Sequence, residues 1–262
     1  MKGALTKAVP KAQSKPERPV LEVTDLKKHF EINGTAVFVL NDVSFCAGAG
    51  EMVCITGRSG CGKTTLLNIL AGFHTPSAGT ALLNGEPIRK PGPDRCVVFQ
   101  EDTLFPWLTV RENITFGLKG RTKDKHYIKR EVDRFLSLVG LREFQHYLPR
   151  EISGGMKQRV AIARVFILQP QVLLMDEPFA SLDYHTRREM HDLLVSIWRE
   201  LGQTILFVTH DVDEAITLAD RILVMDRESG RIHEELAVSP TRPRKIEQPE
   251  YLFLRRKLYE FL

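Results

Sequence analysis

The sequence predicts an α/β fold in which a mostly parallel β-sheet is flanked by helices, and three observations support this prediction. Short apolar runs typical of strands alternate with helical segments between residues 51 and 236. One strand leads directly into a glycine-rich loop and a helix, over residues 51–71. A helical stretch, about residues 101–160, interrupts the alternation. Such alternation indicates a parallel sheet that is covered on both faces.

Two strands are expected ahead of the glycine-rich loop, at residues 20–23 and 37–40. Asn33-Gly34 lies between them, and this dipeptide is typical of a hairpin turn. These strands predict an antiparallel β subdomain beside the main sheet. A buried strand is then expected at residues 51–56, followed by a helix at residues 64–71 that ends at Gly72.

Within the helical stretch, the apolar residues of residues 125–139 recur at three- and four-residue spacing, which places them on one face of a helix. A second helix is expected at residues 156–168. The alternation then resumes as a strand at 172–175, a helix at 186–201, a strand at 204–209, a helix at 212–218, and strands at 221–225 and 231–236. A last helix is expected at residues 251–261.

The net charge of +4 is accounted for by the N-terminal end of the chain. Residues 1–19 carry five Lys or Arg against one Glu, are rich in Pro and show no apolar periodicity, so they are predicted to be a disordered basic tail. Residues 20–240 are predicted to form one domain, and residues 241–262 a helical C-terminal extension. The charge gives no reason to expect nucleic-acid binding by the folded part, so no nucleic-acid partner is predicted.

The composition excludes two classes of protein. No run of eighteen uncharged apolar residues exists, so no segment is expected to span a membrane by itself. The N-terminus lacks the apolar stretch and cleavage site of a secretory signal.

The four cysteines match neither a CxxC pair nor a zinc pattern. Free thiols in a reducing compartment, and hence a cytoplasmic protein, are the expectation.

Residues Gly57 to Thr64 match the phosphate-loop pattern G-x4-G-K-[ST] in full. Glycines let consecutive backbone N–H groups point at phosphate oxygens, and the helix that follows adds its positive end. Lys63 supplies a charge for the β- and γ-phosphates, and the Thr64 hydroxyl suits Mg²⁺. The predicted ATP-binding residues here are Gly57, Arg58, Ser59, Gly60, Cys61, Gly62, Lys63, Thr64 and Thr65.

Asp176 and Glu177 directly follow the apolar run Val172–Met175. A carboxylate at the end of a buried strand can lie beside the metal of a phosphate-loop enzyme, so Asp176 is a predicted Mg²⁺ ligand. Glu177, the next residue, is the predicted catalytic group that orients or deprotonates the attacking water.

The run Ile152-Ser153-Gly154-Gly155-Met156-Lys157-Gln158-Arg159 resembles the signature sequence of ATP-binding cassette (ABC) ATPases, with Ile152 where Leu is usual. A Ser-Gly-Gly turn that opens a helix offers a hydroxyl, free N–H groups and a helix dipole to a phosphate. The resemblance implies a P-loop NTPase core with an antiparallel β subdomain and a helical signature subdomain. It also implies a homodimer in which Ser153, Gly154 and Gly155 face the ATP of the partner chain.

Other elements resemble this family in the same order along the chain. Gln100 is similar to the glutamine that senses Mg²⁺ and water, and is counted as both a catalytic residue and a metal ligand. Asp183, in Ser181-Leu182-Asp183, resembles the loop that links the two ATP sites. His210 resembles the switch histidine that contacts the γ-phosphate. Phe30 resembles the aromatic residue that stacks on adenine, with Phe38 as the alternative.

The run from Leu104 to Val110, Leu-x-Pro-Trp-x-x-Val, is similar to that of ATPases of the nitrate, sulfonate and taurine group of bacterial importers. The resemblance implies a peripheral subunit on the cytoplasmic face of the inner membrane. Its expected partners are membrane permease subunits, docked near Gln100–Val110, and indirectly a solute-binding protein. Trp107 offers an aromatic surface for this docking, and burial in the core is the alternative.

Two other functions fit part of this pattern. A soluble ABC-type ATPase could act on ribosomes or DNA, although such proteins usually carry two cassettes or a long coiled-coil insertion. A small-molecule kinase could use the phosphate loop, although it would have no use for Ser153–Gly155 or Ser181–Asp183. The sequence leaves the transported solute open.

Overall fold

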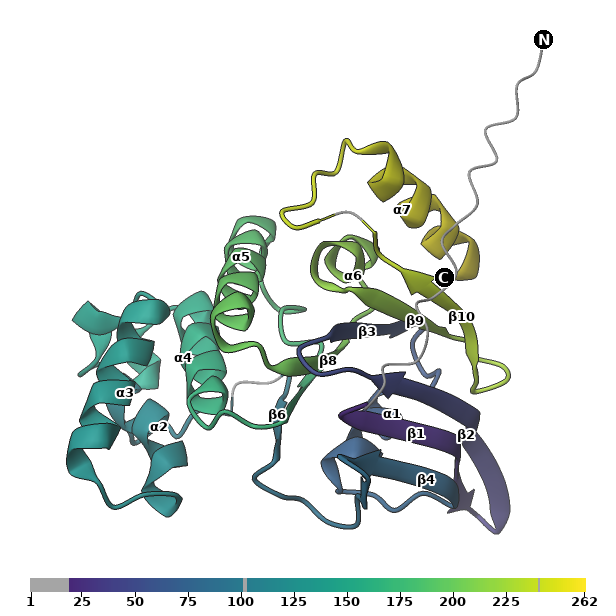
Figure 1. Ribbon diagram of the computed structural model, residues 1–262, viewed down its shortest axis with the longest axis horizontal. Coiled ribbons are helices and arrows are strands. Elements are labelled where there is room, and N and C mark those ends of the chain that lie inside the picture. Colours follow the sequence, from purple (N-terminus) through teal and green to yellow (C-terminus); the bar gives the residue numbers. More distant parts are fainter. Residues whose placement is uncertain (1–18, 101–102, 240) are drawn as a thin grey trace.

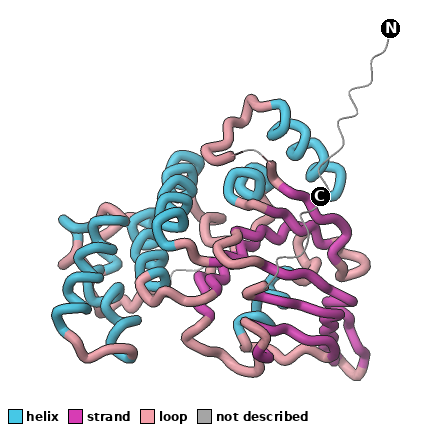
Figure 2. The backbone as a smooth tube through the Cα atoms, in the orientation of Figure 1, coloured by secondary structure: helices cyan, strands magenta, loops and turns pink. Residues whose placement is uncertain are grey.

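The computed structural model describes residues 19–100, 103–239 and 241–262. The predicted basic tail, apart from Pro19, lies outside the described residues. The described part contains two β-sheets. Figures 1 and 2 show helices α2 (Val110–Phe116), α3 (Lys125–Leu138) and α4 (Gly154–Phe166) at one end of the molecule, and an antiparallel sheet at the other.

The antiparallel sheet begins with the predicted hairpin, which is confirmed. Strands β1 (Leu21–Ile32) and β2 (Thr35–Ala47) pair across a turn in which Asn33 and Gly34 have φ values of 52° and 76°. Positive φ at both central residues is what a type I′ turn requires. The sheet is completed by β4 (Ala78–Leu83) and β5 (Glu86–Pro87), in the order β2-β1-β4-β5.

The six-stranded sheet has the order β10-β9-β3-β8-β7-β6, and all neighbours except β10 and β9 are parallel. The predicted parallel α/β core is therefore confirmed. In chain order its strands are β3 (Met52–Gly57), β6 (Arg95–Val98), β7 (Val172–Asp176), β8 (Thr204–Val208), β9 (Arg221–Met225) and β10 (Ile232–Ala237).

Different apolar clusters cover the two faces of this sheet. Along β3, Met52 and Cys54 belong to a cluster with helices α2 to α7, whereas Val53 and Ile55 belong to a cluster with helix α1 (Lys63–Ala71) and the antiparallel sheet. Successive side chains of a strand point to opposite faces. The helices not yet named are α5 (Tyr184–Leu201), α6 (Val212–Leu218) and α7 (Pro249–Phe261).

The predicted helices are confirmed, with ends that differ by two residues or fewer. Helix α5 begins at Tyr184 because the Asp183 carboxylate caps it, accepting hydrogen bonds from the backbone of His185 and Thr186. Helix α7 packs on the core through Tyr251, which is fully buried. No helix in the described ranges is both long and apolar enough to cross a membrane.

Candidate active site

Four predicted parts of the site lie at the carboxyl ends of four neighbouring strands of the sheet: the phosphate loop, Asp176 with Glu177, His210 and Gln100. The loop from Gly57 to Thr64 begins at the end of β3, and Asp176 ends β7. His210 and Gln100 each follow two residues after the ends of β8 and β6. Because β6, β7, β8 and β3 are adjacent and parallel, these ends meet at one edge of the sheet. Ligands of open α/β sheets bind at this edge.

Close packing explains two of the loop glycines. A Cβ on Gly57 would lie 2.5 Å from the carbonyl oxygen of Met225. A Cβ on Gly62 would lie 2.7 Å from Leu40 Cδ2 and 2.8 Å from the carbonyl oxygen of Val39. Gly62 also has a φ of 102°, which side chains disfavour, and it caps the N-terminus of α1. The first turn of α1 holds no acidic residue, so its free N–H groups can serve an anion.

Lys63 is 6% exposed, and its ammonium group lies inside the loop. Nζ donates to the carbonyl oxygens of Gly57 and Arg58, at 2.7 and 3.2 Å. Neutral acceptors leave the positive charge available to a phosphate oxygen. Nearby, burial raises the pKa of the Cys61 thiol, so Cys61 is a protonated packing residue at neutral pH rather than a nucleophile.

Thr64 and Asp176 offer two oxygens that fit a Mg²⁺ ion. The Thr64 hydroxyl donates to Asp176 Oδ1 at 3.3 Å, so β7 and α1 bring together the pair that the sequence predicts. No group of three or more His, Cys, Asp or Glu side chains in the described ranges could hold a metal. Mg²⁺ commonly uses one or two protein oxygens and takes its other ligands from phosphates and water. The pair fits this ion.

Burial raises the pKa of Asp176, and the Glu177 carboxylate adds to this effect, whereas the Thr64 hydroxyl opposes it. A carboxyl group whose pKa is higher in the folded chain than in the unfolded chain weakens the fold as the pH rises from the lower pKa to the higher one. Without nucleotide or metal, the ionised form of Asp176 therefore lowers the stability of the fold.

Replacing Asp176 with Asn should raise the unfolding temperature of the nucleotide-free chain at pH 7. The gain should be about 2 °C, because the partly exposed carboxylate keeps some hydration. The same variant should lose Mg²⁺-dependent ATP hydrolysis. Thermal unfolding at pH 7 and pH 4 measures the effect, which should shrink at the lower pH. A variant that unfolds at a lower temperature than wild type at pH 7 would contradict this reading of Asp176.

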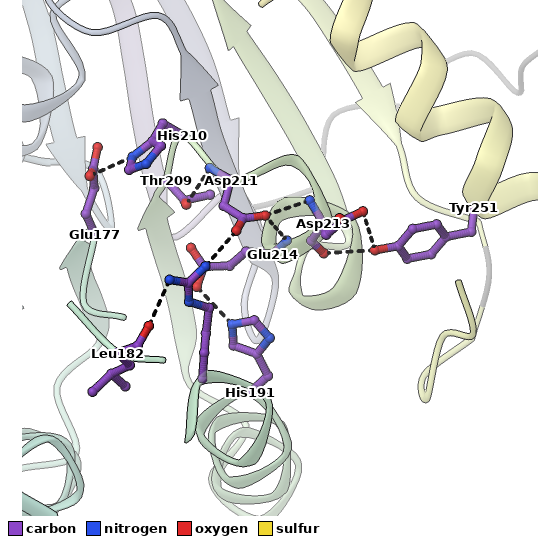
Figure 3. Close-up of polar contacts among 10 residues, drawn as sticks. Glu177, Leu182, His191, Thr209, His210, Asp211, Asp213, Glu214 and Tyr251 are labelled. Atoms are coloured by element: carbon purple, nitrogen blue, oxygen red, sulfur yellow. Dashed lines mark hydrogen bonds and ion pairs between the residues drawn. The ribbon is translucent and has the colours of Figure 1, made fainter. Parts of the chain in front are cut away.

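Glu177 and His210 are in direct contact. His210 Nδ1 lies 2.8 Å from Glu177 Oε2, and His210 is the more exposed of the two. Glu177 has a φ of 45°, in the left-handed region, and its backbone N–H donates to the carbonyl oxygen of Val208. A non-glycine residue at such a φ costs about 1–3 kcal/mol. This strained backbone directs the Glu177 side chain towards His210 (Figure 3).

The signature residues open helix α4, as predicted. Ser153 caps the helix by accepting a hydrogen bond from Met156 N at 3.3 Å, and the first turn carries no acidic residue. A Cβ on Gly155 would lie 2.6 Å from Thr186 Cγ2. Gly155 therefore lets α4 pack against the start of α5, where Asp183 is the cap.

The structure does not join the signature residues to the phosphate loop of the same chain. Ser153 and Gly155 border a cavity of about 190 Å³ whose remaining lining comes from α4, α5 and residues 140–144. The helices that carry the two motifs, α4 and α1, cover opposite faces of the six-stranded sheet.

Two further predicted residues have few described contacts. Phe30, on β1, packs edge-on against His74 with ring centroids 6.0 Å apart, and Lys28 Nζ lies 4.9 Å from the centre of its ring. Its alternative, Phe38, is 68% exposed. None of the described ring contacts of Phe30 reaches Gly57–Thr64. Gln100 is exposed, and it lies beside the end of β7 through the β6–β7 pairing.

The sequence does not predict a role for Arg187. Its guanidinium group donates to the carbonyl oxygen of Leu182 and to the carboxylate of Asp211. The only available signal was the position of Asp211, directly before an expected helix, where Asp is a common cap. Nothing in the sequence indicates the partner of Arg187, because 24 residues separate it from Asp211.

A profile described as ABC transporter matches residues 40–180. The chain is 45% identical over 233 residues to the nitrate import ATP-binding protein NrtD of Synechococcus elongatus, covering 85% of this chain and 84% of that protein. It is 48% identical over 219 residues to the taurine import ATP-binding protein TauB of Roseobacter denitrificans, covering 82% of this chain and 81% of that protein.

Among solved structures, the chain resembles an ATP-binding cassette described as dimeric, in a post-hydrolysis state with bound ADP and Pi. The TM-score is 0.73 at 27% identity, over 84% of this chain and all of the other. With the phosphate loop, the strand-end carboxylates and the signature turn, these likenesses establish the family. The chain belongs to the ABC transporter family and is an ATP-binding protein whose ATPase activity is coupled to transport.

Proposed function

We propose that this chain is the Mg²⁺-dependent ATPase subunit of an importer for a small solute such as nitrate, taurine or another sulfonate. It acts at the cytoplasmic face of the membrane, beside permease subunits and, indirectly, a solute-binding protein. The names of the two relatives, nitrate import and taurine import ATP-binding protein, support the class of solute. Neither alternative function, on ribosomes or DNA or as a kinase, is favoured by these relatives.

The observation that carries the mechanism is the separation of Ser153–Gly155 from the phosphate loop within one chain. An anion-binding helix start that lies away from the chain's own nucleotide can serve the nucleotide of a second copy. The dimeric description of the solved relative supports this arrangement. Two chains would then close around two ATP molecules, each held between one phosphate loop and one signature turn.

In this arrangement Lys63 and the loop N–H groups bind the β- and γ-phosphates, and Thr64, Asp176 and Gln100 would hold Mg²⁺. The ion would screen the charge that develops on the phosphates. Glu177, in contact with His210, orients the water for attack on the γ-phosphate. Phe30 stacks on the adenine. Dimer closure moves the permease subunits, and hydrolysis allows the dimer to reopen.

An exposed aromatic surface is the proposed permease contact. Trp107 is 71% exposed, so its alternative assignment to the buried core is wrong. Phe105 packs between Trp107 and Phe116, with ring centroids 5.7 and 4.5 Å away. The fully buried Asn113 fixes this loop, because its side chain bonds to the backbone of Phe105 and donates to the carbonyl oxygen of Leu108. The part of the predicted docking segment at residues 101–102 lies outside the described residues.

Replacing Trp107 with Ala should weaken association with the permease about thirtyfold, a loss of about 2 kcal/mol, as is typical of a central aromatic anchor. ATP hydrolysis by the isolated chain should stay within about twofold of wild type. Co-purification with the permease and ATP-driven solute uptake in vesicles measure both effects. Tyr259→Ala, which removes another exposed aromatic ring, is the matched control. Normal uptake by the Trp107 variant would remove the docking role.

A further inference from the structure

A polar network behind the active site connects the Ser181–Asp183 loop to His210. Its central residue is Arg187, in the first turns of α5. Nη2 donates to the carbonyl oxygen of Leu182 at 2.9 Å, and Nη1 donates to Asp211 Oδ2 at 2.9 Å. The two guanidinium nitrogens therefore connect the residue before Asp183 to the residue after His210.

Asp211 hydrogen-bonds to Arg187 and to residues on both sides of it in the chain. We therefore expect a change at Arg187 to shift the neighbours of Asp211. Its Oδ1 accepts from the backbone N–H groups of Asp213 and Glu214 and caps α6. Its own N–H donates to the Thr209 hydroxyl at 3.0 Å. His210 lies between Thr209 and Asp211, and its ring contacts Glu177 (Figure 3). The backbone that carries His210 is thus fixed partly by the Asp211 carboxylate.

One helical turn further along α5, a second contact joins α5 to α6. His191 Nε2 lies 2.8 Å from Glu214 Oε1, and the two residues are 9% and 4% exposed. The Phe179 ring, fully buried, packs against the His191 ring at 5.4 Å. Arg187 and His191 are four residues apart on one face of α5, and they bond to the capping residue of α6 and to Glu214 within α6, so sliding of the two helices would break both contacts.

Helix α7 anchors α6 from its other side. The Tyr251 hydroxyl bonds to the Asp213 carbonyl oxygen at 3.2 Å and lies 3.1 Å from Asp213 Oδ1, to which Arg255 Nε also pairs at 3.0 Å. Helix α6 therefore has polar contacts with both α5 and α7. Arg187 joins the Leu182 loop to the His210 loop.

We propose that Arg187 is a positioning residue that couples the Ser181–Asp183 loop to His210. This rests on the proposed dimer, in which that loop senses the second copy. When the Ser181–Asp183 loop is in its position in the closed dimer, the Arg187 guanidinium sets the position of Asp211. This aligns the His210 ring with Glu177. The described hydrogen bonds of Arg187 go to Leu182 and Asp211 and not to the phosphate loop, so its contribution falls on the rate of hydrolysis and not on ATP binding.

The test is the replacement of Arg187 with Gln in the full chain, measured as steady-state MgATP hydrolysis. A misplaced catalytic group can cost up to 10²-fold, so kcat should fall about ten- to a hundredfold while KM stays within about twofold. Arg187→Lys keeps the charge but lacks the rigid fork, and should lose a similar share of kcat. Arg188→Gln removes the exposed neighbouring charge on the same helix and should retain at least half of wild-type kcat.

A double-mutant cycle with Asp211→Asn separates this role from general support of the fold. If Arg187 acts through Asp211, the double variant should lose no more kcat than the more damaged single variant. Losses that multiply, a kcat within twofold of wild type for Arg187→Gln, or a change confined to KM would each overturn the proposal.

A spectroscopic measurement separates a failure of the Arg187 coupling from a failure of the proposed dimer. With histidine Cε1 labelled, Arg187→Gln should shift the His210 resonance and leave that of His233, which packs on Phe261, in place. The His210 signal is assigned by its loss in His210→Gln. An unmoved His210 resonance would overturn the coupling. If instead the dimer proposal is wrong, Glu177→Gln would remain a monomer with MgATP, whereas Arg187→Gln would still shift the His210 resonance.

Discussion

The Glu177→Gln variant is expected to bind ATP normally and to hydrolyse it about 10²–10⁴-fold more slowly than wild type, the range over which general acid–base groups contribute. Gln has nearly the shape of Glu, so the contact with His210 can persist as a hydrogen bond. What is lost is the carboxylate that receives or orients the proton of the attacking water. The substitution leaves Lys63, Thr64 and Asp176 in place, and so leaves ATP–Mg²⁺ binding intact.

Because the dimer is proposed to reopen only after hydrolysis, the same variant should accumulate as a closed dimer with MgATP. Size-exclusion chromatography with and without nucleotide measures this, and a single-turnover assay measures the rate. Glu247→Gln, at an exposed position, is the matched control and should behave as wild type. A wild-type hydrolysis rate in Glu177→Gln would show that another group activates the water.

Lys63→Ala is expected to raise the dissociation constant for ATP roughly a hundredfold. A hydrogen bond to a charged group contributes about 1.5–3 kcal/mol, and Lys63 would make such bonds to phosphate oxygens. The fold should tolerate the change, because Nζ donates to neutral loop carbonyls, so its removal leaves no buried carboxylate unpaired. Hydrolysis and transport should be lost together with binding.

Equilibrium binding of a fluorescent ATP analogue measures this effect, and thermal unfolding checks the fold. Lys125→Ala, at the exposed start of α3, is the control for the loss of one positive charge. Binding by Lys63→Ala within threefold of wild type would mean that the lysine does not contact the nucleotide in this chain.

The core of the fold could be predicted because its central strands β3, β7 and β8 are mostly apolar. β3, β7 and β8 carry no charged residue before their last position, so they stand out from the amphipathic helices between them. The antiparallel sheet was harder to predict. The middle of β1 is polar, with bulges near Asp25 and Lys27, and the observed strand runs far past the predicted residues 20–23. β4 went unpredicted because its Gly79 is set by tertiary packing: a Cβ there would lie 2.2 Å from the Asp25 carbonyl oxygen.

The residues of the site also differ in how far the sequence alone predicts them. The phosphate loop, Asp176 with Glu177, and His210 each follow a strand, and local sequence is enough to place them at one edge of a parallel sheet. The resemblance implied separate roles for Glu177 and His210; the structure adds their direct contact and the strained φ of Glu177. The Arg187 network could not be predicted from the sequence, because it depends on how α5 lies against α6. The exposure of Trp107 likewise depends on tertiary packing.

The central claim is that the phosphate loop of one chain and the signature turn of another form one site. Its most direct test uses two variants in the Glu177→Gln background, one with Lys63→Ala and the other with Ser153→Arg. Each variant lacks one half of every site and should stay monomeric with MgATP. In a mixture, the intact loop of one chain meets the intact signature turn of the other. We predict a dimer with one trapped nucleotide per two chains; a mixture that remains monomeric, or either variant that dimerises alone as fully as Glu177→Gln, would contradict the claim.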